Sequence, residues 1–302
     1  MRLWRHGENW RRRRVMRRLK LRSAFLRWWH GPLGPNPDAR IVLTVRYSVH
    51  FLGGREGWVV KDKLSPQEHV AWLFNEDRLL ERLQFFSGIL LPSLLTQDMP
   101  MQRNRRELVV YISEGLPDAH RTALEATIGQ YDWARLVPVP MGALEYPDVG
   151  VDVEHAHLRI DDDDALSRDF LSRLSAYVRP EFHGNIITQP VGYFAGFNDA
   201  GHLILKRVWV PMIAMGIAYI VGPRTAFRSI YEVGPHFHAY GAAPTIIGDS
   251  APAYVRTVHP GQSMYPLTLF EGDPTINLEE VWRHIEFDPD ALRPVQRSRR
   301  AL

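Results

Sequence analysis

The stretch Arg159-Ile160-Asp161-Asp162-Asp163-Asp164 contains four consecutive carboxylates and directly follows an alternating apolar segment that begins at His155. Alternation predicts a β-strand, and the residues after the run favour a helix. Neighbouring carboxylates oppose one another's ionisation, so either solvent screens them or a hard divalent cation such as Mg²⁺ or Mn²⁺ neutralises them. Ligands of open α/β sheets bind beyond the carboxyl ends of the strands, where this run would lie. The stretch is therefore a candidate cation site.

A structural explanation of the same run is a solvated turn. In that case one carboxylate, with Asp164 the best placed, would cap a helix that starts near Ala165. The positive N-terminal end of a helix favours a carboxylate at that position.

The composition of this chain of 302 residues restricts the classes of protein to which it can belong. A hydrophobic content of 45% and a charged content of 24% are typical of a globular protein with a sizeable core. The absence of Cys excludes disulfides, a thiol nucleophile and Cys-ligated metals, and it fits a reducing cytoplasm. No apolar run reaches the roughly 18 to 20 residues of a membrane span. We therefore expect a cytoplasmic protein, either soluble or peripheral at the inner membrane face.

The N-terminal arm, residues 1–37, is strongly basic and ends in a Pro/Gly-rich linker. Its first thirty residues hold eleven Lys or Arg against one Glu, a net charge of +10 in a chain whose total is +3. Trp and other apolar residues interleave with these charges. This pattern predicts a basic amphipathic helix that contacts anionic membrane, and an inert or disordered leader is the alternative. We do not expect nucleic acid as a partner.

Strand and helix patterns alternate over the first half of the chain. The expected strands cover 41–45, 108–112, 134–139 and 156–160. The expected helices cover 76–95, which would end or kink at Pro92, and 117–128. Later β segments are shorter and cover 185–189, 193–197, 202–210 and 218–221. The pattern predicts an α/β fold with a mostly parallel central sheet flanked by helices and a smaller mixed region.

Five spaced features give the chain its resemblance to a known family. They are Arg46-Tyr47-Ser48, the helix Arg82-Leu83-Gln84-Phe85-Phe86 with Leu91-Pro92-Ser93-Leu94 and Gln97, the strand 109–113 with Leu116-Pro117, the segment 159–166, and Val258-His259. Together they resemble the bacterial rhamnosyltransferase family, glycosyltransferases of the GT-A fold. The resemblance covers residues 41 to 262. It implies one GT-A-like domain over 38–290, with a nucleotide-binding half (38–165), an acceptor half (166–290) and a tail (291–302).

The resemblance also implies a DxD-like motif in which carboxylates bind Mn²⁺ or Mg²⁺ beside the diphosphate of a nucleotide sugar. Residues two apart at a strand end point the same way, so Asp161 and Asp163 are the expected metal pair. Asp162 would then face the ribose or the sugar hydroxyls, and a register that uses Asp162 and Asp164 stays open. Similar folds supply a late histidine as a third metal ligand, which here is His259.

Four further residues are expected to bind the donor. Arg46 and Ser48 follow the first strand, where similar enzymes bind the nucleotide. Arg82 and Arg159 could pair with a phosphate oxygen or with the carboxylates of the acidic run. For all three arginines a structural ion pair is the alternative.

The catalytic base is unassigned. Asp249, Glu271 and Asp273 lie in the expected acceptor half, and none has support beyond its position. The spacing His-x-His at 155–157 and at 236–238 could ligate a metal, but neither pair has further support.

Three functions follow from these observations. The leading one is a metal-dependent glycosyltransferase that moves a sugar, rhamnose by resemblance, from a nucleotide-sugar donor to a glycan or glycoconjugate acceptor. A metal-dependent phosphoester or pyrophosphate hydrolase is second, and a His-based hydrolase of this kind would require one of the His-x-His pairs to join the acidic run. The third is a non-catalytic carbohydrate or polyanion binder.

Overall fold

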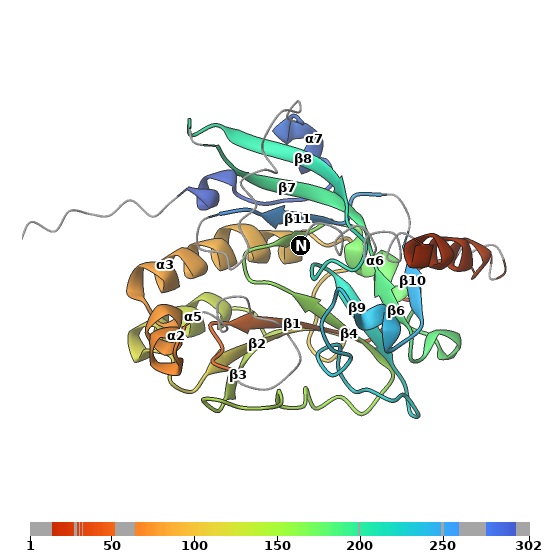
Figure 1. Cartoon of the computed structure of the whole chain (residues 1–302), viewed down its shortest axis with the longest axis horizontal. Coiled ribbons are helices and arrows are strands. Elements are labelled where there is room, and N and C mark those ends of the chain that lie inside the picture. The colour runs from red at the N-terminus through yellow and green to blue at the C-terminus, as the bar shows by residue number, and fades with distance from the viewer. Residues whose placement is uncertain are drawn as a thin grey trace, which may run out of the picture.

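A large sheet of seven strands forms the centre of the protein (Figure 1). The structure, a computed structural model, describes residues 14–26, 29, 31, 33–51, 64–198, 200–248, 251–259 and 276–293. The strand order is β10-β6-β9-β4-β1-β2-β3. The strands are β1 (Ile41–Tyr47), β2 (Arg106–Ser113), β3 (Ala134–Val139), β4 (His155–Ile160), β6 (Ile186–Thr188), β9 (Ile217–Val221) and β10 (Thr245–Ile247).

The expectation of a mostly parallel sheet is wrong, because the sheet is mixed. Strands β3, β2, β1 and β4 are parallel neighbours, as the βα alternation predicts. Strand β9, however, runs antiparallel to both β4 and β6. The chain leaves the large sheet after β6, makes the β7–β8 hairpin and returns in the opposite direction. The later β segments therefore extend the large sheet as well as forming a separate one.

The second sheet has four strands in the order β5-β11-β7-β8. They are β5 (Ala165–Leu166), β11 (Tyr254–Thr257), β7 (Val191–Phe197) and β8 (Leu203–Trp209). Strands β7 and β8 form the expected hairpin, in which Phe197 pairs with Leu203. This sheet packs against α7 (Leu278–Trp282) and the 3₁₀ turn η6 (Pro289–Leu292) through Tyr193, Val255 and Val281.

The two faces of the large sheet have different covers. On one face Ile41, Leu43 and Val45 pack beneath helices, which are α3 (Glu76–Phe85), α4 (Leu91–Leu95), α5 (Asp118–Ile128) and α6 (Phe170–Ser175). On the other face Val42 and Val109 pack beneath irregular segments around residues 143–151 and Tyr231. Short helical elements also occur at α2 (Pro66–Leu73), η3 (Pro180–Phe182) and η4 (Ala239–Gly241).

The helix predicted over 76–95 exists but contains a π-helical turn, η2 (Phe86–Leu90), between α3 and α4. Pro92 has no N–H, so it cannot bond the carbonyl of Gly88 one turn earlier. That carbonyl accepts a hydrogen bond from the backbone N–H of Asp288 instead, at 2.8 Å. A wider turn next to a proline is a known way to accommodate such a break.

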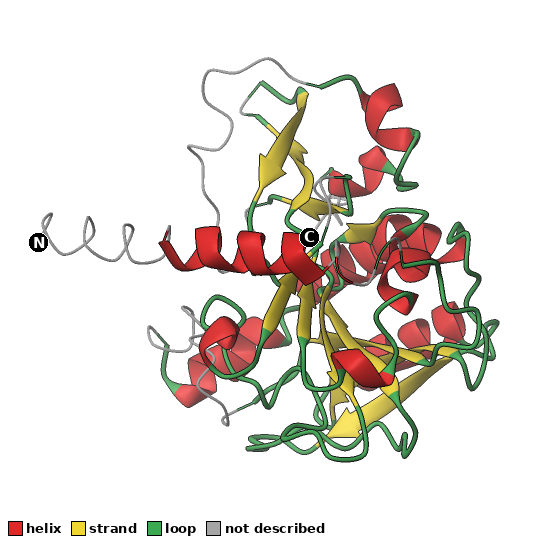
Figure 2. Cartoon of the chain, turned by 90° about the vertical axis from the view of Figure 1, so that its right-hand side faces the viewer, coloured by secondary structure: helices red, strands yellow, loops and turns green. Residues whose placement is uncertain are grey.

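Residues 14–26 form a helix that packs on the body of the protein (Figure 2). Met16 is buried against a cluster that includes Ile186 and Tyr219. The Ser23 hydroxyl oxygen accepts a hydrogen bond from the backbone N–H of Ile247 at 2.8 Å. No helix within the described residues is both long and apolar enough to cross a membrane.

Candidate functional site

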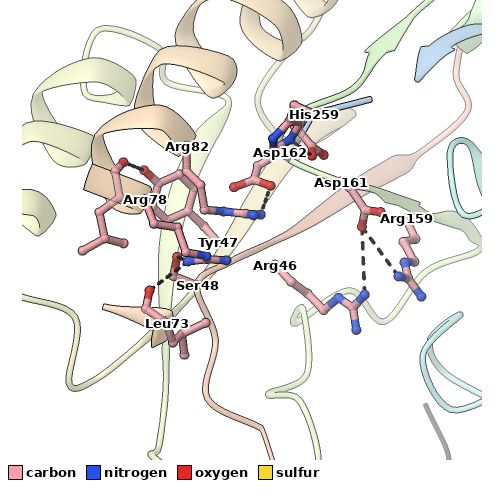
Figure 3. Close-up of polar contacts among 12 residues, drawn as sticks. Arg46, Tyr47, Ser48, Leu73, Arg78, Arg82, Arg159, Asp161, Asp162 and His259 are labelled. Atoms are coloured by element: carbon pink, nitrogen blue, oxygen red, sulfur yellow. Dashed lines mark hydrogen bonds and ion pairs between the residues drawn. The ribbon is translucent and has the colours of Figure 1, made fainter. Parts of the chain in front are cut away.

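The acidic run lies where the carboxyl ends of β1 and β4 meet (Figure 3). These strands are parallel neighbours with Val45 beside Ile160, so the residues that follow each strand come to one edge of the sheet. The helix expected to start near Ala165 is wrong. Residues 165–166 form β5 and pair with β11, and α6 begins only at Phe170. A helix cap at this position is thereby excluded.

The four carboxylates do not share one environment, because the chain turns at the run. The backbone N–H of Asp164 donates to the carbonyl of Asp161 at 3.4 Å, so the alternation of an extended strand ends at Ile160. Asp161 is 30% exposed at its side chain, whereas the next three residues are buried. Each of the four carboxylates accordingly has a different set of neighbours.

Asp161 lies beside two arginines from neighbouring strands. Its Oδ1 is 3.6 Å from Nη2 of Arg159 and 3.9 Å from Nη2 of Arg46. Both guanidinium groups also lie over the ring of Tyr231, at 5.7 Å and 5.3 Å from its centroid. The structure therefore brings Arg46, Arg159, Asp161 and Tyr231 together.

Asp162 is fully buried on the helix side of the edge and forms an ion pair with Arg82 of α3. Burial raises the pKa of Asp162 to about 7, against the lowering effect of Arg82. Its other oxygen, Oδ2, has no hydrogen-bond partner among the described residues. Because Asp162 is shielded from water, its ionised form is stabilised mainly by the positive charge of Arg82.

Asp163 and His259 form the closest contact between two candidate metal ligands. Nε2 of His259 lies 3.0 Å from Oδ2 of Asp163, and both side chains are about 8% exposed. The imidazole rests on Phe85, with ring centroids 4.3 Å apart. Strand β11 thus delivers the late histidine to the acidic run, although 96 residues separate the two.

Asp164 has a structural partner, since its Oδ1 accepts the backbone N–H of Thr257 at 3.0 Å. This bond ties the acidic run to the end of β11, two residues before His259. Burial, followed by the neighbouring Asp163, raises the pKa of Asp164 well above its ordinary value.

A second arginine of α3, Arg78, was not predicted. Its Nη1 donates to the Ser48 hydroxyl at 3.0 Å and to the Leu73 carbonyl at 2.8 Å. Burial, then the neighbouring Arg82, lowers the pKa of Arg78 to about 9. Ser48 has a φ of 51°, a left-handed conformation that non-glycine residues seldom adopt. The spacing of four residues between Arg78 and Arg82 was a signal in the sequence, whereas nothing local pointed to Tyr231.

The donor set at this edge fits a divalent cation in part. A carboxylate oxygen and an imidazole nitrogen, as in Asp163 and His259, are ligands that Mn²⁺ accepts. Asp161 does not join them, because its carboxylate is directed to Arg46 and Arg159 (Figure 3). Across the described segments, no three His, Asp or Glu side chains gather into a metal-binding group. The DxD pairing of Asp161 with Asp163 therefore stays a prediction.

The remaining candidates lie apart from this edge or outside the described residues. His155 and His157 have ring centroids 6.4 Å apart within β4, and neither they nor His236 and His238 belong to a three-ligand group in the part of the chain that the structure describes. Asp249, Glu271 and Asp273, the acceptor-half carboxylates considered as bases, lie outside the described residues.

The fold and the site define an α/β protein with a charged ligand site at the carboxyl ends of its parallel strands. Residues 40–263 match the family described as "Putative rhamnosyl transferase", and the chain belongs to that family. Membership confirms the expected glycosyltransferase class. No curated protein matches the chain.

Several solved structures resemble the chain, and two of them illustrate the extent of the similarity. One is S. aureus TarS 1–349, with a TM-score of 0.38 and 13% identity over 72% of this chain and 60% of that one. The other is the mannosyltransferase PcManGT from Pyrobaculum calidifontis in complex with GDP-Man and Mn²⁺, with a TM-score of 0.37 and 14% identity over 80% of this chain and 64% of that one. The chain spans less than two thirds of the length of either structure.

Proposed function

We propose that this protein is a metal-dependent glycosyltransferase of the GT-A type that moves a sugar from a nucleotide-sugar donor to a glycan or glycoconjugate acceptor. The observation that supports it most directly is the contact between Asp163 and His259 at the carboxyl end of β4. Two ligand types suited to Mn²⁺ meet there beside a group of arginines, within a chain that belongs to a family of sugar transferases.

Asp163 and His259 are the residues that would hold the cation, which is Mn²⁺ or Mg²⁺ in this proposal. When bound, the cation stabilises the negative charge that develops on the diphosphate leaving group. Phe85 fixes the imidazole ring and Thr257 holds Asp164, so β11 and the acidic run keep a constant spacing. Such fixed positions lower the reorganisation that the reaction requires.

The arginines divide into two groups with different roles. Arg82 neutralises the buried Asp162 and so preserves the shape of the acidic run. Arg46 and Arg159 hold Asp161 only at 3.9 Å and 3.6 Å, so a donor phosphate can compete for them as an anionic partner. Ser48, with Arg78 behind it, adds a hydroxyl at the end of β1 for the nucleoside part of the donor.

The identity of the donor follows from the family alone. Rhamnose is the proposed sugar, and UDP, GDP and dTDP are the nucleotides to compare. The proposed organisation is one catalytic domain over 38–290, with a donor half (38–165), an acceptor half (166–290) and a tail (291–302). A cytoplasmic location fits the use of a nucleotide sugar.

The N-terminal helix is proposed to hold the enzyme at an anionic membrane surface. Its inward face packs through Val15, Met16 and Leu19. The outward face is an exposed stripe at helical spacing, which we call the arm stripe, and it comprises Arg14, Arg17, Arg18, Leu21, Arg22, Phe25 and Trp29. Cations and exposed aromatic rings together are the groups that favour anionic headgroups and the membrane interface.

Product analysis tests the proposed reaction. The protein is incubated with UDP-, GDP- or dTDP-linked sugars, a glycan acceptor and Mn²⁺, and both the released nucleotide and the sugar product are identified. A glycan enlarged by one sugar supports the transferase. Free sugar, or sugar 1-phosphate together with the nucleoside monophosphate, as the main product with and without acceptor would favour the hydrolase. No turnover of any donor would favour the binding protein.

A further inference from the structure

A cavity of about 1170 Å³ lies on the sheet face opposite the helices. Its walls come from the segment after β1, from residues 144–149, from β2 and β4, and from residues 227–242. Small-molecule sites usually have volumes of about 300 to 1,000 Å³, so this cavity is large enough for a ligand of more than one ring. None of the proposed donor-binding residues lines it, nor do Asp161, Asp163 and His259, the expected metal ligands of the acidic run.

Four aromatic side chains form one wall of the cavity. Tyr146 stacks on Phe51, with ring centroids 4.2 Å apart and planes inclined by 15°. The centroid of its ring also lies 4.7 Å from the ring centroid of Tyr231 and 5.1 Å from that of Tyr111. These four residues, which we call the aromatic wall, come from four separate parts of the chain. Faces of this kind pack against flat or ring-shaped ligands.

His157 lines the same cavity, is fully buried, and has a ring nitrogen without a partner among the described residues. Its Nδ1 accepts the backbone N–H of Ile230 at 3.4 Å, so in the neutral ring the proton lies on Nε2. Nε2 is buried and has no hydrogen-bond partner among the described residues. Burial, followed by His155, lowers the pKa of His157 to about 3, so the ring is neutral near pH 7. A buried donor without a partner is costly, and a ligand oxygen would satisfy it.

The charges around the cavity select against an anion. Three carboxylates line it, from Glu145, Asp148 and Glu232, and Arg228 is the cation among the lining residues. An excess of carboxylates repels a diphosphate and accepts hydrogen bonds from hydroxyl groups. The combination of aromatic faces, carboxylate acceptors and one neutral donor matches a polyhydroxylated ring.

The position of the cavity connects it to the candidate site. Tyr231 belongs to the aromatic wall, and its ring also lies beneath the guanidinium groups of Arg46 and Arg159. A ligand in the cavity is therefore one side chain away from the arginines that hold Asp161.

We propose that this cavity binds a neutral saccharide, with a sugar ring against Tyr146 and a ring oxygen or hydroxyl at His157. The acceptor role of that saccharide rests on the proposed function, whereas the binding itself does not. The site would thus supply the acceptor from the sheet face opposite the helices.

Ligand-detected NMR of the full chain tests the proposal without requiring turnover. The probes are methyl α-L-rhamnoside, methyl α-D-mannoside and methyl β-D-galactoside at millimolar concentrations, compared with UDP, GDP and dTDP in the presence of diamagnetic Mg²⁺. The variants are Tyr146→Leu, which removes the stacking face, and Tyr146→Phe, which retains it. Tyr131→Leu is the matched control, because Tyr131 stacks on Trp133 outside the cavity.

We expect at least one glycoside to bind the wild type. In Tyr146→Leu its dissociation constant should rise by about three- to tenfold, the range that an aromatic contact supports. Tyr146→Phe and Tyr131→Leu should bind the glycoside as the wild type does, and nucleotide binding should be unchanged in all three variants. Should glycosides bind in this pattern while no nucleotide binds, the saccharide site stands and the transferase proposal fails.

Three results would overturn the proposal. They are no binding of any glycoside to the wild type, glycoside binding that Tyr146→Leu leaves unchanged, and loss of nucleotide binding in Tyr146→Leu. The last would assign the cavity to the donor base while leaving the transferase proposal intact.

Discussion

At the residue scale, the acidic run assigns a different partner to each of its four carboxylates. Asp162 has the strongest dependence on one neighbour, because it is fully buried and pairs with Arg82. Removing one member of a buried ion pair leaves the other charge without compensation, at a cost of several kcal/mol. The stability of the edge should therefore depend on Arg82 even in the absence of any ligand.

Replacing Arg82 tests this dependence. Arg82→Leu should lower the free energy of unfolding by about 3 kcal/mol. The double variant Arg82→Leu/Asp162→Asn should recover a large part of that loss, because the stranded charge is gone. Urea denaturation of the wild type, both single variants and the double variant measures the coupling. A loss in the double variant equal to the sum of the losses in Arg82→Leu and Asp162→Asn would show that the pair is not coupled.

The buried His157 predicts a pH dependence of stability. Its pKa falls from 6.5 in the unfolded chain to about 3 in the folded protein, so below pH 6.5 the unfolded state binds the additional proton. Stability should therefore fall as the pH drops below 6.5, by up to about 2 kcal/mol at pH 5 from this residue.

Urea denaturation at pH 7 and pH 5, in the wild type and in His157→Gln, measures this effect. Between pH 7 and pH 5, His157→Gln should lose less free energy of unfolding than the wild type does. It should retain some dependence, because burial also lowers the pKa of His155. An identical loss in the wild type and the variant would contradict the assignment to His157.

At the element scale, the break in the helix over 76–95 is the feature that best connects sequence to structure. Pro92 predicts a kink, and the structure shows a π-helical turn with Gly88 inside it. A Cβ atom added at Gly88 would lie 2.5 Å from Cβ of Ala291 in η6. Ala is otherwise preferred over Gly in helices by about 1 kcal/mol, so only this contact makes glycine the better residue here.

Gly88→Ala should therefore destabilise the protein, by about 1 to 3 kcal/mol for overpacking. Ser87→Ala is the matched control on the adjacent exposed position and should have little effect. Adding Ala291→Gly to the first variant should restore part of the loss. Thermal unfolding of the three variants checks the prediction, and a Gly88→Ala protein as stable as the wild type would contradict it.

The elements show which parts of the fold local patterns can predict. Strands 41–45 and 108–112 were recognisable because buried parallel strands are continuous apolar segments, and strand 156–160 was recognisable from its alternating pattern. The antiparallel insertion of β9 was not predictable, since residues 218–221 have the same apolar pattern in either direction. The helix expected at Ala165 was wrong because pairing with β11, a contact made 90 residues away at Val255, overrode local preference.

The same limit applies to the site. Local spacing pointed to Arg159 and the acidic run, whereas the expectation for Arg46 came from the family resemblance. Local spacing could not predict that the chain turns after Ile160, which separates Asp161 from Asp163. The expectation for His259 came from the family resemblance, and its contact with Asp163 is consistent with it.

At the scale of the whole molecule, the arm stripe predicts binding to anionic vesicles. Each basic residue near an anionic surface contributes about 1 kcal/mol. The triple variant Arg17→Gln/Arg18→Gln/Arg22→Gln should therefore weaken binding by about two orders of magnitude. Vesicle sedimentation at low and high salt measures it.

The control for this experiment removes the same charge elsewhere. Arg103, Arg224 and Arg283 are exposed and lie outside the arm, so their triple Gln variant should bind vesicles nearly as well as the wild type does. If both triple variants bind equally, net charge rather than the arm stripe determines the interaction.

The central claim is that Asp163 and His259 make nucleotide binding depend on a metal. The most direct measurement is the melting temperature with UDP, GDP and dTDP, each with and without Mn²⁺, because a ligand of the folded state raises it by mass action. It is made on the wild type, Asp163→Asn, His259→Gln and the control His183→Gln, whose histidine pairs with Glu154 elsewhere. We expect a rise for at least one nucleotide that requires Mn²⁺, disappears in the first two variants and persists in the control. A metal-dependent rise that survives in both Asp163→Asn and His259→Gln, or no such rise in the wild type, would contradict the account.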